Sequence, residues 1–219
     1  MLQHESISFK VYELLKQEIV SNQLEPGARL IVSNISKRFG VSGIPVREAL
    51  FRLEAEKLII LEHNKGFRVA EKPDAQDIYK WQQARLLIEP AIADIVLENI
   101  TASEIAYLRQ LNIDMRTHEY GPHYEQYVYF INLNAEFHKQ IVMASRNELI
   151  IEMYNTLNYG PQVGRFHENR GVPDLQLLCN EHDEIIDAIE ARNADIYREK
   201  TTEHIILGFD RQISFGSAG

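Results

Sequence analysis

A run of ten residues, VSGIPVREAL, starts at Val41 and constrains the fold more than any other part of the chain. Ser42 is of a type that caps helices through its hydroxyl, and Pro45 falls in a first turn, where a missing amide hydrogen costs little. Apolar residues then recur at helical spacing, at Val46, Leu50 and Leu53. The pattern predicts a helix that buries one face and leaves Arg47 on another.

Shorter patterns on either side complete a small module. Before the run, Ile35 and Phe39 lie four apart and Gly40 suits the left-handed turn that ends a helix, so a helix is expected from about Ser33 to Phe39. After it, the apolar run 58–61, the turn residues 63–66 and the alternating residues 67–69 predict a two-stranded wing. Upstream, a first helix is expected with an apolar face made of Phe9, Leu14, Leu15, Ile19 and Val20.

Residues 1–72 are therefore predicted to form a winged helix-turn-helix, and the distribution of charge agrees with a nucleic-acid partner. This module carries eleven Lys and Arg residues against nine Asp and Glu residues, a net charge of +2. Because the whole chain of 219 residues has a net charge of −9, the other 147 residues carry −11. Phosphate would repel that acidic part, so DNA binding is expected in the N-terminal module alone.

Residues 73–219 predict a second domain that is entirely helical. Helical periodicities recur between breaks rich in Gly, Pro and Asn, and the first of them reads as one pattern from Ile78 through Leu87 to Ile95. Alternation typical of strands is not seen in residues 73–219. We expect a mainly α protein in which the winged module is followed by an antiparallel bundle of six or seven helices.

The cysteine content and the apolar runs bear on where the protein acts. The single cysteine, Cys179, excludes an intrachain disulfide. The sequence shows neither a signal-like start nor an apolar run of membrane length. A cytoplasmic protein without a membrane partner is therefore expected.

Four residues of the second domain could hold a metal ion. Asn134 and His138 lie four apart, so on a helix both project from one face. His182 and His204 fall in two other predicted helices and could each add an imidazole. Three imidazoles and one oxygen favour a divalent transition metal such as Zn²⁺ or Ni²⁺ over Ca²⁺ or Mg²⁺. Histidines are also common at the surface or as hydrogen-bonded core residues, so spacing alone leaves both interpretations open.

Several spaced motifs of the N-terminal module occur in an order typical of one family. They are LxPGxxL from Leu24 to Leu30, VSxxPVREAL from Val41 to Leu50, LxxxxL over 53–58 and GxxV over 66–69. Together they resemble the DNA-binding domain of the GntR family of bacterial transcription regulators. Members of that family usually carry Arg-Thr where this chain has Gly43-Ile44, and an acidic residue where it has Val32.

The resemblance implies a set of DNA contacts. Arg47 stands where the family has its second recognition-helix arginine, and together with the start of that helix, at Ser42, Gly43 and Ile44, it is expected to read base edges in the major groove. Phosphate contacts are expected from the basic residues nearby and from the wing tip, namely Arg38, Arg52, Lys65, Gly66 and Arg68. Since the family's usual arginine is missing at Gly43, sequence-specific binding is the property that this departure affects.

Residues 74–215 resemble the all-helical FCD ligand-binding domain of the FadR-like branch. The matching motifs are RxxxE from Arg85 to Glu89, NxxFH from Asn134 to His138, EHxxI from Glu181 to Ile185, and His204-Ile205. In that family an aspartate or asparagine and three histidines at these places hold a metal, to which a small carboxylate effector binds. For Arg85 two interpretations stay open: a clamp on the effector's carboxylate, or an ion pair with Glu89 one turn along the helix.

The sequence thus predicts a homodimeric regulator that is not an enzyme. Two recognition helices would bind the two halves of a near-palindromic DNA operator, and a small organic acid at the metal would change operator affinity. One alternative is a metal-dependent hydrolase or lyase, although no supporting base motif such as HExxH occurs. Another is an effector-binding interaction protein that has lost specific DNA recognition through Gly43-Ile44.

Overall fold

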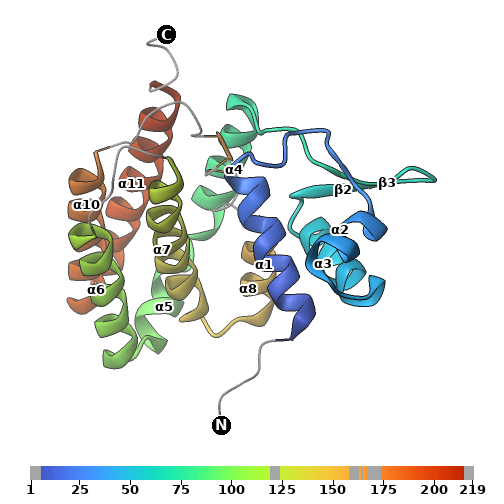
Figure 1. Ribbon diagram of the computed structural model, residues 1–219. Coiled ribbons are helices and arrows are strands. Elements are labelled where there is room, and N and C mark those ends of the chain that lie inside the picture. Colours follow the sequence, from blue (N-terminus) through green and yellow to red (C-terminus); the bar gives the residue numbers. More distant parts are fainter. Residues whose placement is uncertain (1–5, 119–123, 158–162, 164, 167–173, 215–219) are drawn as a thin grey trace. The chain divides into compact units, whose positions relative to one another are not determined.

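The computed structural model describes residues 6–118, 124–157, 163, 165–166 and 174–214 (Figure 1). The chain divides into two compact units, Met1–Lys72 and Pro73–Gly219. The predicted mainly α architecture, a winged module followed by a helical bundle, is confirmed.

The N-terminal unit consists of three helices and a small sheet. Helix α1 spans Ile7–Val20, α2 spans Val32–Phe39 and α3 spans Gly43–Ala55. Strands β2 (Ile59–Glu62) and β3 (Gly66–Val69) form the expected wing, in which Ile60 pairs with Arg68. All three helices bury apolar residues in one core, among them Leu15, Ile35, Val46, Leu50 and Leu53.

The prediction of a two-stranded sheet was incomplete, because a third strand pairs with β3. Strand β1 spans only Arg29–Leu30, and the antiparallel order is β1-β3-β2. Gly27 adopts a φ of 78°, a conformation that side chains disfavour, and its amide donates to the carbonyl of Val69. The loop at Gly27 therefore returns the chain to the open edge of β3.

The turn between α2 and α3 forms as expected, but the expected cap does not. Gly40 has a φ of 65°, and the amide of Val41 closes the turn on the carbonyl of Ser36 at 3.0 Å. Ser42 occupies the N-cap position of α3 with extended backbone angles, yet its hydroxyl makes no capping hydrogen bond in the structure. The role predicted for that hydroxyl was wrong, and α3 is held by the burial of its apolar face.

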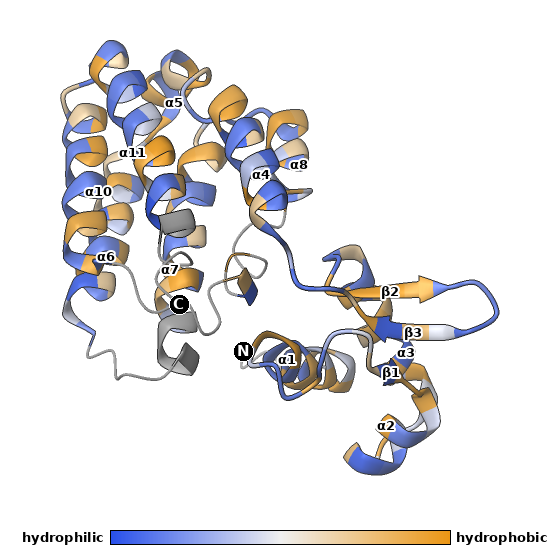
Figure 2. Ribbon diagram, turned by 90° about the horizontal axis from the view of Figure 1, so that it is seen from above, coloured by the Kyte–Doolittle hydropathy of each residue, from blue (hydrophilic) through white to orange (hydrophobic). Residues whose placement is uncertain are grey.

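Seven helices make up the described part of the C-terminal unit, within the predicted six or seven. They are α4 (Ala75–Ile88), α5 (Ala93–Asn99), α6 (Ala102–Thr117), α7 (Tyr124–Met143), α8 (Glu148–Asn155), α10 (Leu175–Glu190) and α11 (Ala194–Ser214). Figure 2 shows hydrophobic and hydrophilic residues interspersed along them, as in amphipathic helices. None of the helices in the described residues is long and apolar enough to cross a membrane.

The single periodicity expected from Ile78 to Ile95 is two helices. Helix α4 ends at Ile88 and α5 begins at Ala93, with Pro90 between them. Proline lacks an amide hydrogen and its ring clashes with the preceding turn, so the helix cannot continue through it. Leu87, which the periodicity placed on the apolar face, is 78% exposed. The break leaves Glu89 just beyond α4, where its side chain is 3% exposed.

Candidate metal centre and DNA-reading helix

Three histidines from three helices meet inside the C-terminal unit. His138 lies on α7, His182 on α10 and His204 on α11, and all three are at most 4% exposed. One nitrogen of each lies within 4.8 Å of those of the other two. The Nε2 atoms of His138 and His204 are 3.1 Å apart. The fold therefore brings together three imidazoles that are 22 to 66 residues apart in sequence.

The outer nitrogen of each ring has a partner that accepts a hydrogen bond. His138 Nδ1 lies 3.0 Å from Glu89 Oε2, and His204 Nδ1 lies 2.8 Å from Glu181 Oε2. His182 Nδ1 lies 3.3 Å from Asn112 Oδ1, whose amide nitrogen donates to the Cys179 carbonyl and to Asp183. Because each partner is an acceptor, each Nδ1 carries the proton and donates.

This pattern of tautomers leaves an Nε2 lone pair on every ring of the cluster. The Nε2 atoms of His138 and His204 then face each other at 3.1 Å with two lone pairs, which repel unless a cation lies between them. His182 Nε2 is buried and has no hydrogen-bond partner among the described residues. Carboxylate or amide partners on the outer nitrogen are the usual second layer of a histidine metal site. These residues fit a metal ion.

Asn134 supplies an oxygen on the same helix as His138, one turn earlier. Its Oδ1 is buried and has no hydrogen-bond partner in the described part of the chain. Leaving a buried amide oxygen unpaired costs free energy comparable to a lost hydrogen bond. The unsatisfied oxygen is a candidate fourth ligand.

Burial keeps the three imidazoles neutral, which is the form that binds metal. Burial lowers the pKa of His138 to about 3, and the nearby Arg85 charge adds to the effect. Burial likewise lowers the pKa of His182 well below its usual value, and that of His204 below it. For Glu89, burial would raise the pKa, but Arg85 and His138 together hold it well below the usual range, so the carboxylate is charged.

Arg85 forms the ion pair that was one of its two interpretations. Its Nε donates to Glu89 Oε1 at 2.5 Å and its Nη2 donates to Oε2 at 3.1 Å, and both side chains are at most 4% exposed. Tyr154 also donates to Glu89 Oε1, at 3.0 Å. Glu89 therefore joins Arg85 to His138. Two of the five N–H donors of the guanidinium are used in this pair.

Sequence reasoning missed the supporting residues of the cluster. The i, i+4 spacing of Arg85 and Glu89 signalled their pair, but nothing in the sequence connects Glu89 with His138, or Glu181 with His204. Asn112, 70 residues before His182, gave no signal at all.

Helix α3, which is predicted to read DNA, presents a mostly apolar first turn. Ile44 is 68% exposed, and Arg47, one turn further, is exposed. A Cβ atom at Gly43 would lie 3.4 Å from Arg47 Nη1 and 3.4 Å from Val32 Cγ1. Two of the three positions at which this chain departs from the family pattern, Val32 and Gly43, are therefore neighbours.

The other predicted DNA contacts differ in their surroundings. Arg38 donates to Glu18 at 2.8 Å, and Arg68 donates to Glu62 at 2.7 Å. The guanidinium of Arg52 lies over the ring of Tyr12, 4.1 Å from its centroid. At the tip of the wing, Lys65 is exposed and Gly66 has a φ of 83°, which the tight turn requires.

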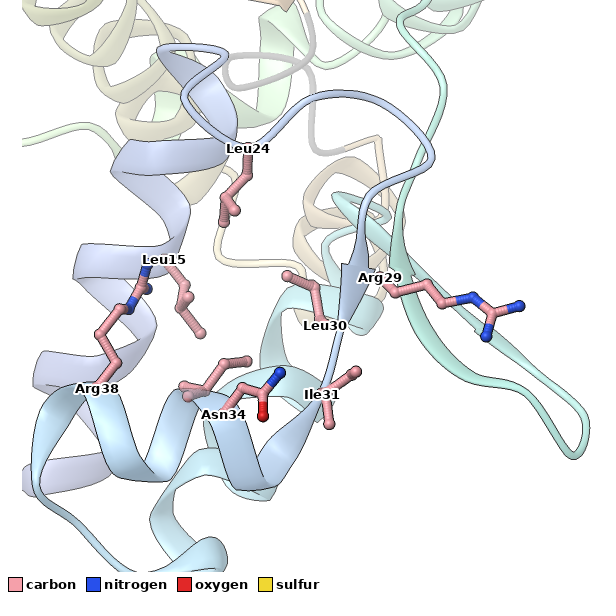
Figure 3. Close-up of a pocket in the computed structure, with 8 residues that line it drawn as sticks. Leu15, Leu24, Arg29, Leu30, Ile31, Asn34 and Arg38 are labelled. Atoms are coloured by element: carbon pink, nitrogen blue, oxygen red, sulfur yellow. The ribbon is translucent and has the colours of Figure 1, made fainter.

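A small pocket opens within the N-terminal unit, between α1, the loop before β1, and α2 (Figure 3). It has a volume of about 160 Å³, and its lining includes neither α3 residues nor any of the three histidines. The lining residues are Leu15, Leu24, Arg29, Leu30, Ile31, Asn34, Ile35 and Arg38. It is separate from both the residues that would read bases and the histidine cluster.

A winged helix-turn-helix followed by a helical bundle is the architecture of a DNA-binding regulator, and comparison with known proteins agrees. Residues 8–69 match the bacterial regulatory proteins of the gntR family, and residues 81–207 match the FCD domain. The chain belongs to the FCD-containing branch of the GntR family of transcription regulators. It is a regulator and not an enzyme.

Individual relatives are distant but span nearly the whole chain. The HTH-type transcriptional regulator McbR of Escherichia coli is 26% identical over 89% of this chain and 87% of McbR. The HTH-type transcriptional regulator YdhC of Bacillus subtilis is 25% identical over 91% of this chain and 86% of YdhC. The solved structure of E. coli McbR/YncC superposes with a TM-score of 0.74 at 24% identity, covering 96% of this chain and 98% of that one.

Proposed function

We propose that this regulator is a cytoplasmic homodimer whose affinity for a DNA operator is set by a small carboxylate bound at a transition-metal ion in the C-terminal unit. The ion would be held by His138, His182, His204 and Asn134. The observation that carries the proposal is the arrangement of the three rings: every Nδ1 faces an acceptor, which leaves each Nε2 lone pair available, and the rings offer ligand atoms within 4.8 Å of one another.

The donor set indicates which ions the site would take. Three neutral imidazoles and one amide oxygen suit Zn²⁺ or Ni²⁺, while Ca²⁺ and Mg²⁺ prefer oxygen ligands only. An amide is a weaker donor than the carboxylate of many family members and carries no charge. More positive charge therefore remains on the ion, which weakens metal binding and strengthens the attraction for an anion.

Arg85 would add a second positive charge for the effector. Its charge acts on all three histidines, lowering the pKa of each, so it lies close enough to influence an anion at the ion. Glu89 accepts hydrogen bonds from the Nε and Nη2 atoms of Arg85. The effector's carboxylate would therefore have to bind the other N–H groups of the guanidinium. When bound, the ion supplies a Lewis-acid position for the carboxylate, and the protein orients the imidazoles and excludes water.

DNA binding would use one recognition helix from each subunit. A homodimer matches a near-palindromic operator, because a two-fold axis relates both the helices and the half-sites. Arg47 would read base edges, while Arg38, Arg52, Lys65 and Arg68 would contact phosphates. A DNA-binding regulator acts where the chromosome lies, which in bacteria is the cytoplasm.

A titration of operator DNA tests the proposal. An operator selected from random DNA would be labelled, and its affinity for the full-length protein measured by fluorescence anisotropy with and without Zn²⁺ and with acetate or citrate as carboxylate probes. We expect a carboxylate-dependent change of affinity in the metal-loaded protein that His138→Ala abolishes. His118→Ala, an exposed histidine outside the cluster, is the matched control and should keep the change.

The outcomes separate the parts of the proposal. If Zn²⁺ binds but neither carboxylate nor metal alters operator affinity, the sensing role is wrong. If no DNA sequence is enriched under any of these conditions, the chain is instead an effector-binding protein that has lost specific DNA recognition.

A further inference from the structure

The exposed face of α3 has an unusual composition for a surface that meets DNA. Four residues form one stripe at i, i+3, i+4 and i+7, opposite the buried face: Ile44, Arg47, Glu48 and Phe51. Two of the four are large apolar side chains, 68% exposed at Ile44 and 52% exposed at Phe51. Ile44 is the most exposed large apolar side chain among the described residues of the N-terminal unit.

The first turn of α3 offers no polar side chain to DNA. Residues 43–46 are Gly, Ile, Pro and Val, so they carry neither a charge nor a hydrogen-bonding group. Val32, which lies beside Gly43, is apolar as well. The start of the recognition helix can therefore contact phosphates or polar base edges only through its backbone, and its side chains can make only apolar contacts.

The major groove contains one apolar group that such a side chain can recognise. Thymine presents its C5-methyl group there, whereas the other base edges present hydrogen-bond donors and acceptors. The N-terminal residues of a recognition helix are the ones that reach base edges. Ile44 is the second residue of α3, and its side chain projects from the helix instead of packing in the core.

We infer that Ile44 is a specificity residue that contacts the methyl group of a thymine in each operator half-site. The inference rests on the operator binding proposed above. Arg47 lies three residues further, about 4.5 Å along the helix axis, and arginine pairs best with guanine through O6 and N7. Since successive base pairs are about 3.4 Å apart, the thymine lies within one or two base pairs of the guanine read by Arg47.

Replacing thymine by deoxyuridine tests this contact, because the exchange removes only the methyl group. An operator would be selected from random DNA with the full-length protein, and each thymine of the half-sites would then be replaced in turn. Affinities would be measured for the unmodified protein, for Ile44→Ala and for Leu14→Ala. Leu14 is an exposed apolar residue of α1, 46% exposed, and serves as the matched control.

We expect one thymine per half-site at which deoxyuridine weakens binding about fourfold. This is the change in Kd that corresponds to the free energy of burying one methyl group. Leu14→Ala should keep that loss, whereas Ile44→Ala should bind weakly and equally to both DNAs. Because Ile44 is mostly exposed, Ile44→Ala should keep the helical circular dichroism of the unmodified protein.

Two results would overturn the inference without touching the proposed function: a selected operator in which no thymine is sensitive to deoxyuridine, or an Ile44→Ala variant as sensitive as the unmodified protein. In the second case the thymine methyl is read by another residue. A selection that enriches no sequence would refute specific DNA binding by this protein. The proposed contact between Ile44 and a thymine would then be refuted as well.

Discussion

Glu89 is the residue on which the buried polar network depends most, and Glu89→Gln is the change that tests it. Its Oε1 accepts from Arg85 Nε and from Tyr154, and its Oε2 accepts from Arg85 Nη2 and from His138 Nδ1. A glutamine keeps one acceptor and turns the other into an amino group. In either orientation that amino group faces two donors.

The cost follows from burial and charge. The side chains of Glu89 and Arg85 are 3% and 4% exposed, so water cannot replace the lost carboxylate charge. Removing one partner of a buried ion pair costs about 3–5 kcal/mol. When the amino group takes the place of Oε2, His138 also loses the acceptor that fixes its tautomer. Loss of such a partner lowers metal affinity by about 10- to 100-fold.

Urea denaturation and metal titration measure these two effects separately. Glu184→Gln is the control, because its pair with Lys200 at 3.1 Å is exposed and its removal should cost roughly 0–1 kcal/mol. Combining Glu89→Gln with Arg85→Met should cost less than the sum of the two single changes, since no uncompensated charge remains. A decrease in the free energy of unfolding below about 1 kcal/mol for Glu89→Gln alone would refute the reasoning. Leaving the buried charge of Arg85 without its partner should destabilise the fold by more than that.

Three further predictions concern the reading helix and the histidines. Arg47→Ala should weaken binding to the selected operator by about 10- to 100-fold while non-specific DNA binding changes little; equal losses on both DNAs would contradict base reading. Gly43→Ala should stabilise the N-terminal unit by about 0.4–1 kcal/mol, because Gly43 is helical and a Cβ there would make contacts of 3.4 Å; a lower unfolding midpoint would contradict this. Because burial lowers the pKa values of the three histidines, the unfolded state binds more protons below pH 6.5. In the metal-free protein the free energy of unfolding should therefore decrease as the pH falls below 6.5. His138 alone should account for up to about 1.4 kcal/mol per pH unit down to its pKa of about 3. Denaturation in EDTA between pH 7.5 and 5.5 checks this, and unchanged stability would contradict it.

The parts of the fold that local patterns determine were predictable from the sequence. Amphipathic periodicity located α1, α2 and α3, and the turn-forming residues 63–66 located the wing. Strand β1 was not predictable, because two residues, Arg29 and Leu30, are too few to show a pattern and its position depends on pairing with β3. The break after α4 was visible as Pro90, but the apolar residues on both sides suggested a continuous helix.

The candidate metal ligands were predictable only through the family resemblance, since spacing alone did not connect helices α7, α10 and α11. Long-range partners could not be predicted at all. The contacts of Glu89 with His138 and of Asn112 with His182 join residues 49 and 70 positions apart, and no local rule brings such residues together. The proximity of Val32 and Gly43 could not be predicted either, because it depends on how α2 and α3 pack against each other.

The central claim is that three Nε2 atoms share one metal ion, and X-ray absorption of the Zn²⁺-loaded protein tests it most directly. The account predicts one ion per chain with three imidazole ligands at about 2.0–2.1 Å, and two imidazoles after His182→Ala. A spectrum that fits fewer than three imidazoles, or one that His182→Ala leaves unchanged, would contradict it.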